Sequence, residues 1–297
     1  MMRIKSRTLL MFAVVFASIF PLNFFPHIQD LPVGAHGQLS GKQGEVLVVT
    51  VPVKGDPNKV VGHLLNREIP FFPMDDGNYV GLLGLDMQDK PGQHDLAIQV
   101  EYADHTDRHK VTVLLMKEKY NVQHLQLPKK MVDLDSKTLV RVKQESKRLH
   151  QAFHTVLPEP LWSSGFIEPV HGRVSGRFGS RRVINGQSKR PHSGEDIAAP
   201  NGTPVVAMNS GIVRLTMDHF FTGKGVILDH GLGLFSMYFH LSSVDVAQGQ
   251  MVEKGQPIGK VGATGRATGP HLHWGVRLNG ARINPYSLLN ISLNGMS

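Results

Sequence analysis

Turn-forming clusters divide most of this sequence into short runs of strand-forming residues, and this pattern favours a mainly β architecture. Between residues 37 and 117, the turns GDPN, DDGN, DKPGQ and DHTDR separate the runs GEVLVVTVPV, NYVGLLGLDM, HDLAIQVEYA and HKVTVLLM. Short strands at nearly regular spacing with Gly, Pro, Asn and Asp turns are typical of a small sandwich. We therefore predict an N-terminal Ig-like β-sandwich over residues 37–117 as an accessory domain.

In the second half, turn-forming residues again separate short strand-like runs. GRVSGRFG, TPVVAM, GIVRLTM, KGVILDHG, LFSMYFHLS, PIGKVG and HLHWGVRL follow one another, and SRRVINGQSKRPHSGED near residue 190 looks like a long polar loop. No helical period interrupts these runs, which predicts a compact antiparallel β domain over residues 161–297.

Residues 118–160 are expected to link the two β domains through one amphipathic helix. Asp135 or Ser136 can cap its start, and Trp162, just beyond the linker, can pack across the domain boundary. One helical stripe is formed by Leu139, Val142, Leu149 and Phe153. The change from strand-like alternation to this spacing marks the linker.

Residues 1–26 have the pattern of an export segment. Basic residues precede an apolar run from Leu9 to Phe20, which Pro21 interrupts, and this order is typical of a signal peptide. A small-x-small cleavage site is not clear, so an uncleaved membrane anchor running to Phe25 is the alternative. Both interpretations predict an exported protein in the periplasm, in the cell envelope or outside the cell.

Composition excludes several kinds of site. The chain has no cysteine, so disulfides, thiolate metal sites and a cysteine nucleophile are excluded, and a metal would need His and carboxylate ligands. Lys and Arg outnumber Asp and Glu by 32 to 24, a formal charge of +8. This charge suits an anionic polymer or a membrane surface, or is ordinary solvated charge, but without a nucleic-acid motif it does not indicate DNA or RNA.

The run HLHWGVRL places two histidines on one side of a predicted strand. Alternate side chains of a strand face opposite ways, so His271 and His273 point together while Leu272 and Trp274 face the core. Convergent imidazoles indicate a metal or catalytic site, although an HxH pair also occurs on the solvated face of a half-buried strand.

The run PHSGED supplies a matching carboxylate and a further imidazole. His192 and Asp196 are four residues apart, which puts both on one side of either a helix or a strand. Together with the HxH pair they provide two imidazoles and one carboxylate, the set that leaves zinc a fourth position for water. The pattern is not HExxH.

Neighbouring segments add weaker candidates. In LFSMYFH, alternation puts Ser236, Tyr238 and His240 on one side, from which His240 could reach the same groove; alone, it would be an ordinary polar strand residue. The glycines of GATGRATG match no phosphate-binding loop, and we interpret them as clearance for an extended peptide. The basic residues of the polar loop, including Arg181 and Arg182, either attract substrate carboxylates or are solvated charge.

Four motifs within residues 169–289 together resemble the lysostaphin/LytM-type zinc endopeptidases that cut peptidoglycan cross-bridges. They are GRFGSRRxxNG, PHSGED, VILDHGLGLFSMYFHLS and VGATGRATGPHLHWGV. Spacing alone does not decide which histidine of the HxH pair binds metal. The region before the motifs resembles the accessory domain of some exported members. The resemblance implies one zinc ion bound by His192, Asp196 and His273, with His240 and His271 as catalytic histidines.

The resemblance implies a zinc metalloendopeptidase that hydrolyses peptide cross-links of bacterial peptidoglycan through a metal-activated water, in cell-wall remodelling or lysis. Its partners would be stem peptides or cross-bridges. The alternative is a non-catalytic LytM-type module that binds the wall or activates another murein hydrolase, and a polyanion-binding β protein is a further hypothesis based on charge alone. We also expect the front half to position or cover the groove; the sequence identifies no regulatory protein partner.

Overall fold

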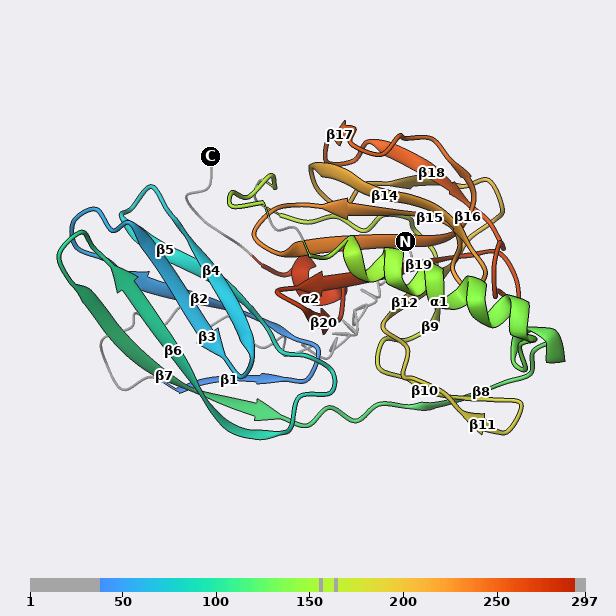
Figure 1. Ribbon diagram of the computed structural model, residues 1–297, viewed down its shortest axis with the longest axis horizontal. Coiled ribbons are helices and arrows are strands. Elements are labelled where there is room, and N and C mark those ends of the chain that lie inside the picture. The colour runs from blue at the N-terminus through green and yellow to red at the C-terminus, as the bar shows by residue number, and fades with distance from the viewer. Residues whose placement is uncertain (1–37, 155–156, 163–164, 292–297) are drawn as a thin grey trace, which may run out of the picture.

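The computed structural model contains two β-rich halves that lie side by side, with one long helix across the second half (Figure 1). It describes residues 38–154, 157–162 and 165–291. The predicted mainly β architecture, with a linking helix and an antiparallel second half, is confirmed. The predicted export segment 1–26 lies outside the described residues. Within those residues, no helix has the length and apolar character needed to cross a membrane.

The N-terminal half is a seven-stranded sheet with the order β1-β7-β6-β3-β4-β5-β2. The sheet folds into two layers, one containing β3 and the other containing β5. Strand β4 pairs with β3 through its first residues and with β5 through its last, so it belongs to both layers. Side chains from both layers, among them Val51, Phe71 and Ile98, close one apolar core. The strands are β1 (Gln38–Lys42), β2 (Val46–Pro52), β3 (Lys59–Leu64), β4 (Arg67–Pro73), β5 (Asn78–Gly84), β6 (Gly92–Glu101) and β7 (Thr106–Met116).

The C-terminal half is built on a ten-stranded antiparallel sheet. Seven of its strands pair side by side in the order β17-β14-β15-β16-β19-β12-β9. The short helix α2 (Tyr286–Leu289) comes after the last strand in the sequence. Its strands are β9 (Arg173–Gly176), β12 (Gly194–Ala198), β13 (Pro204–Val206), β14 (Gly211–His219), β15 (Gly223–Asp229), β16 (Leu234–Val244), β17 (Met251–Val252), β18 (Pro257–Val261), β19 (His271–Leu278) and β20 (Ala281–Ile283).

The predicted linker helix is α1 (Ser136–Gln151), which follows the short 3-10 helix η1 (Lys129–Met131). Asp135 caps α1, because its side chain accepts a hydrogen bond from the Thr138 N–H at 2.8 Å. The C-terminal end of the segment packs on the second half, where the Phe153 and Phe235 rings meet edge to face at 5.3 Å. The helix is therefore attached to the sheet of the C-terminal half.

Two pieces of secondary structure correct the sequence prediction. Within the predicted linker, β8 (Val122–Leu125) pairs in parallel with β10 (Arg181–Ile184), which pairs with β11 (Gln187–Ser188). The predicted polar loop is therefore largely a β-hairpin. Of the residues in these short strands, only Ile184 is buried, so neither segment has a period-2 apolar pattern. Their pairing is long-range, and local sequence cannot signal it.

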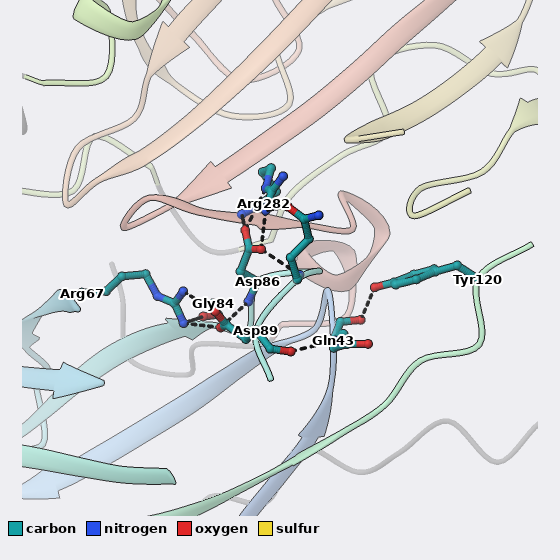
Figure 2. Close-up of polar contacts among 8 residues, drawn as sticks. Gln43, Arg67, Gly84, Asp86, Asp89, Tyr120 and Arg282 are labelled. Atoms are coloured by element: carbon teal, nitrogen blue, oxygen red, sulfur yellow. Dashed lines mark hydrogen bonds and ion pairs between the residues drawn. The ribbon is translucent and has the colours of Figure 1, made fainter. Parts of the chain in front are cut away.

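The two halves share an interface that fixes one against the other. Arg282 of β20 donates to the Asp86 carboxylate through Nη2 at 2.6 Å and Nε at 2.9 Å (Figure 2). Trp162, which is 3% exposed, meets Phe72 of β4 edge to face at 5.3 Å, as the predicted packing across the boundary requires. One apolar cluster includes residues of both halves. The front half thus packs directly against the C-terminal half.

Candidate metal centre

A row of residues across four paired strands places two of the predicted ligands directly opposite each other. Asp196 of β12 pairs with His273 of β19, and Gly176 and Phe239 extend the row on either side. Paired residues share one face of a sheet, and the Asp196 Oδ1 lies 2.8 Å from His273 Nδ1. A Cβ on Gly176 would lie 2.5 Å from Asp196 Oδ2, so only glycine allows the carboxylate to occupy this position.

His192 reaches the same point from the turn before β12. Its backbone N–H donates to the Ser180 carbonyl at 2.9 Å, and the side chain is almost fully buried. The His192 Nε2 lies 2.9 Å from both Asp196 Oδ1 and His273 Nδ1. The structure therefore brings His192, Asp196 and His273 together, and we call these residues the trio.

The donor atoms of the trio fit a metal ion. His192 Nδ1 donates to the Arg177 carbonyl at 3.1 Å, so its Nε2 presents a lone pair to the Asp196 oxygen. Burial lowers the pKa of His192 to about 4, although Asp196 opposes this, so the ring is neutral at neutral pH. Burial would raise the pKa of Asp196, but His192 and His273 hold it well below its usual value. A cation between these lone pairs relieves their repulsion, and two imidazoles with a carboxylate suit zinc.

Arg182 orients the carboxylate of the trio. Its Nη2 donates to Asp196 Oδ2 at 2.7 Å, which leaves Oδ1 directed at the two histidines. Neither sequence interpretation of the basic loop predicted this internal ion pair. Arg182 lies on β10, opposite Gln123 of the linker strand β8. The linker thus supports a side chain that contacts the trio.

His240 and His271 lie beside the trio, with ring centroids 4.7 Å apart, and we call them the histidine pair. His271 Nε2 lies 3.8 Å from Asp196 Oδ1. Each Nδ1 donates to a backbone carbonyl of the loop 262–270, His240 to Thr264 and His271 to Gly269, both at 2.8 Å. These bonds place the hydrogen on Nδ1 of each ring, so each Nε2 is left to exchange a proton or bind a polar group.

His240 reaches this face for a reason that strand alternation does not provide. Ser236 and Tyr238 point into the core and are fully buried, and strict alternation would place His240 with them. Instead, His240 has a φ of 65°, and the pairing of β16 with β15 and β18 shifts register around it. The sequence prediction that His240 shares a side with Tyr238 was wrong. A left-handed non-glycine residue costs roughly 1–3 kcal/mol, and such strain is concentrated at functional sites.

The glycine-rich loop before His271 also differs from its sequence interpretation. A Cβ on Gly265, whose φ is 70°, would lie 2.3 Å from the Gly223 backbone nitrogen. A Cβ on Gly262 would lie 2.3 Å from the Ser242 nitrogen. These two glycines permit close backbone packing around the histidine pair and do not create open space, whereas a Cβ on Gly269 would meet no atom within 4 Å, so the clearance interpretation is contradicted only at Gly262 and Gly265.

The comparisons with known proteins agree with this geometry. A family model described as Peptidase family M23 matches residues 190–285, a range that contains the trio and the histidine pair. A crystal structure of a Pseudomonas aeruginosa protein assigned to peptidase M23 has a TM-score of 0.65 and 33% identity, covering 83% of this chain and 94% of that chain. This chain belongs to peptidase family M23. The resemblance to lysostaphin/LytM-type peptidases is thereby confirmed.

Curated relatives of this M23 chain match its C-terminal half. Peptidoglycan DD-endopeptidase ShyA of Vibrio cholerae is 43% identical over 114 residues, which is 38% of this chain and 26% of the relative. DD-carboxypeptidase/endopeptidase Mpg of Neisseria meningitidis is 44% identical over 123 residues, 41% of this chain and 28% of the relative. The M23 chain thus matches only about a quarter of the length of either relative.

Proposed function

We propose that this M23 chain is a zinc-dependent endopeptidase that hydrolyses peptide cross-links of bacterial peptidoglycan. The observation that carries the proposal is the convergence of the trio and the histidine pair on one face of the sheet. The names of the relatives, Peptidoglycan DD-endopeptidase and DD-carboxypeptidase/endopeptidase, support this substrate and favour a DD cross-link. The non-catalytic alternative is disfavoured because all five predicted side chains are present.

The proposal assigns different parts of the chain to export, support and chemistry. Residues 1–26 act as a signal peptide or membrane anchor, which places the enzyme in the periplasm or cell envelope. Residues 37–117 form the accessory domain, residues 118–160 the linker, and residues 161–297 the peptidase domain. Epitope detection in fractionated cells, with and without residues 1–26, tests the export role: equal export of both forms would contradict it.

The trio is assigned to metal binding. His192 Nε2, Asp196 Oδ1 and His273 Nδ1 would hold one Zn²⁺, since these are the atoms that converge. Zinc held by three protein ligands keeps a position for water and lowers the pKa of that water to about 7. Arg182 holds Asp196 Oδ2, and the Arg177 carbonyl holds His192 Nδ1, so both ligands are orientated before metal binds.

The histidine pair is assigned to proton transfer and to stabilising the oxyanion. The free Nε2 of His240 or His271 can accept a proton from the attacking water, and a protonated Nε2 can donate to the developing oxyanion. The Thr264 and Gly269 carbonyls fix both rings through Nδ1. Burial, with a contribution from His273 and then His271, lowers the pKa of His240 to about 3, so the ring is neutral and its Nε2 carries a lone pair at neutral pH.

Metal analysis combined with digestion of isolated cell walls tests the proposal. We expect the wild type to contain one zinc per chain and to release muropeptides, and His273→Ala to lose both properties. Mass spectrometry of the products then identifies the bond that is cut. A wild-type protein that bound the wall without releasing muropeptides would support the non-catalytic alternative, and one without zinc would contradict the metal assignment.

A further inference from the structure

The loop that holds the histidine pair also carries an arginine held in a defined position. The Arg266 backbone N–H donates to the Phe221 carbonyl at 2.9 Å, and the guanidinium carbon lies 4.2 Å from the centre of the Phe221 ring. Arg266 is two residues from Thr264, whose carbonyl accepts from His240. Arg266 thus belongs to the loop that holds the histidine pair, and stacking on an aromatic ring fixes its side chain.

The positive charge of Arg266 has no ion-pair partner in the described part of the chain. Among the described residues, no carboxylate forms an ion pair with Arg266, although the side chain is half-buried. The charge that acts on it is of the same sign: burial, and then the Arg182 guanidinium, lower the pKa of Arg266. Arg182 itself is neutralised by Asp196. A half-buried guanidinium without an anion is energetically unfavourable, and a bound anionic group would relieve this cost.

The geometry points to Arg266 as a specificity-determining residue that binds a free carboxylate of the substrate peptide close to the bond being cut. This inference rests on the proposed function. Guanidinium groups bind carboxylates through paired N–H donors, and the stacked position of Arg266 leaves little side-chain freedom to lose on binding. Neutral substrates of the same shape would lack this contact.

A pair of matched substrates tests the inference. The substrates are a purified cross-linked muropeptide dimer and the same dimer after amidation of its free carboxylates. The measured quantity is the ratio of kcat/KM for the free dimer to kcat/KM for the amidated dimer. We expect a ratio of about ten to a hundred for the wild type, in line with one charge-assisted contact, a ratio near one for Arg266→Met, and an intermediate ratio for Arg266→Lys.

Arg277→Met is the matched control. Arg277 of β19 also stacks on a phenylalanine, with its guanidinium carbon 4.5 Å from the centre of the Phe153 ring, but it lies toward the opposite end of β19 from His271. This variant should keep the wild-type ratio. A wild-type ratio near one, or a wild-type ratio retained by Arg266→Met, would overturn the inference while leaving the proposed function intact. Failure of the wild type to cleave either dimer would overturn both.

Discussion

The trio and the histidine pair share one face of the sheet but are connected differently. In the trio, the His192 and His273 nitrogens and one Asp196 oxygen face one another at 2.8–2.9 Å. In the pair, each Nδ1 faces a backbone carbonyl, and the rings are 4.7 Å apart. The first arrangement collects lone pairs at one point, and the second leaves one free nitrogen per ring. His192 also donates through Nδ1 to a backbone carbonyl, so the comparison teaches that the groups facing the free ring nitrogen decide what a histidine can do.

Removing a member of the trio should have the largest effect. We expect Asp196→Ala to lose zinc and to reduce kcat/KM on muropeptides at least about a thousandfold, because electrostatic assistance worth several kcal/mol disappears. Metal analysis and kinetics on the same sample measure both quantities. His171→Ala, at a side chain that is 96% exposed, is the control and should behave as wild type. Retention of wild-type zinc and activity by Asp196→Ala would contradict the assignment of the trio.

Changes in the histidine pair should separate chemistry from metal binding. We expect His240→Ala and His271→Ala each to retain one zinc per chain and to reduce kcat about a hundredfold or more, as loss of a proton-transfer or oxyanion group does. Zinc content and kcat are the measurements. If either variant lost zinc as Asp196→Ala does, the distinction between trio and pair would be incorrect.

Replacing Arg182, which holds the carboxylate of the trio, should produce an intermediate effect. Arg182→Met removes the donor to Asp196 Oδ2, and we expect zinc affinity to fall about ten- to a hundredfold, the usual effect of losing a partner of a metal ligand. Competition with a chelator measures this affinity. Arg182→Lys should restore part of it, while Arg181→Met, at the exposed neighbouring position, should leave it unchanged. Equal affinities for Arg182→Met and Arg181→Met would show that Arg182 does not orient the carboxylate.

The smallest effect is expected from replacing Phe239, whose ring stacks on His273 of the trio. Phe239 lies parallel to His273, with ring centroids 5.6 Å apart and an interplanar angle of 3°. Phe239→Leu should weaken zinc binding by a few-fold, equivalent to about 1 kcal/mol for an aromatic contact. Phe153→Leu removes a ring that packs on Phe235 and not on the trio, and it should lower thermal stability without changing zinc affinity. A larger change in zinc affinity for Phe153→Leu than for Phe239→Leu would exclude a specific role for this stack.

The strand patterns predicted the β architecture and the helix, and the short motifs, through the family that they resemble, predicted the residues that converge. The HxH spacing fixes relative side-chain direction, because strand geometry has a period of two, whereas His192 of HxxxD lies in the turn before β12 and is positioned by its backbone bond to Ser180. Arg182 could not be assigned in this way, since its position depends on the pairing of β10 with β8. The left-handed backbone at His240 was also missed, because the register shift around it involves two neighbouring strands.

The sequence by itself thus determined which side chains of HLHWGVRL face away from the core, since alternation is a local property of a strand. Only the tertiary structure decided what each of those histidines faces. His273 meets Asp196 because β12 and β19 pair in that register, whereas His271 meets the Gly269 carbonyl of its own loop. These contacts form between backbone segments that folding brings together. The positions of backbone carbonyls cannot be deduced from the identities of the residues that carry them.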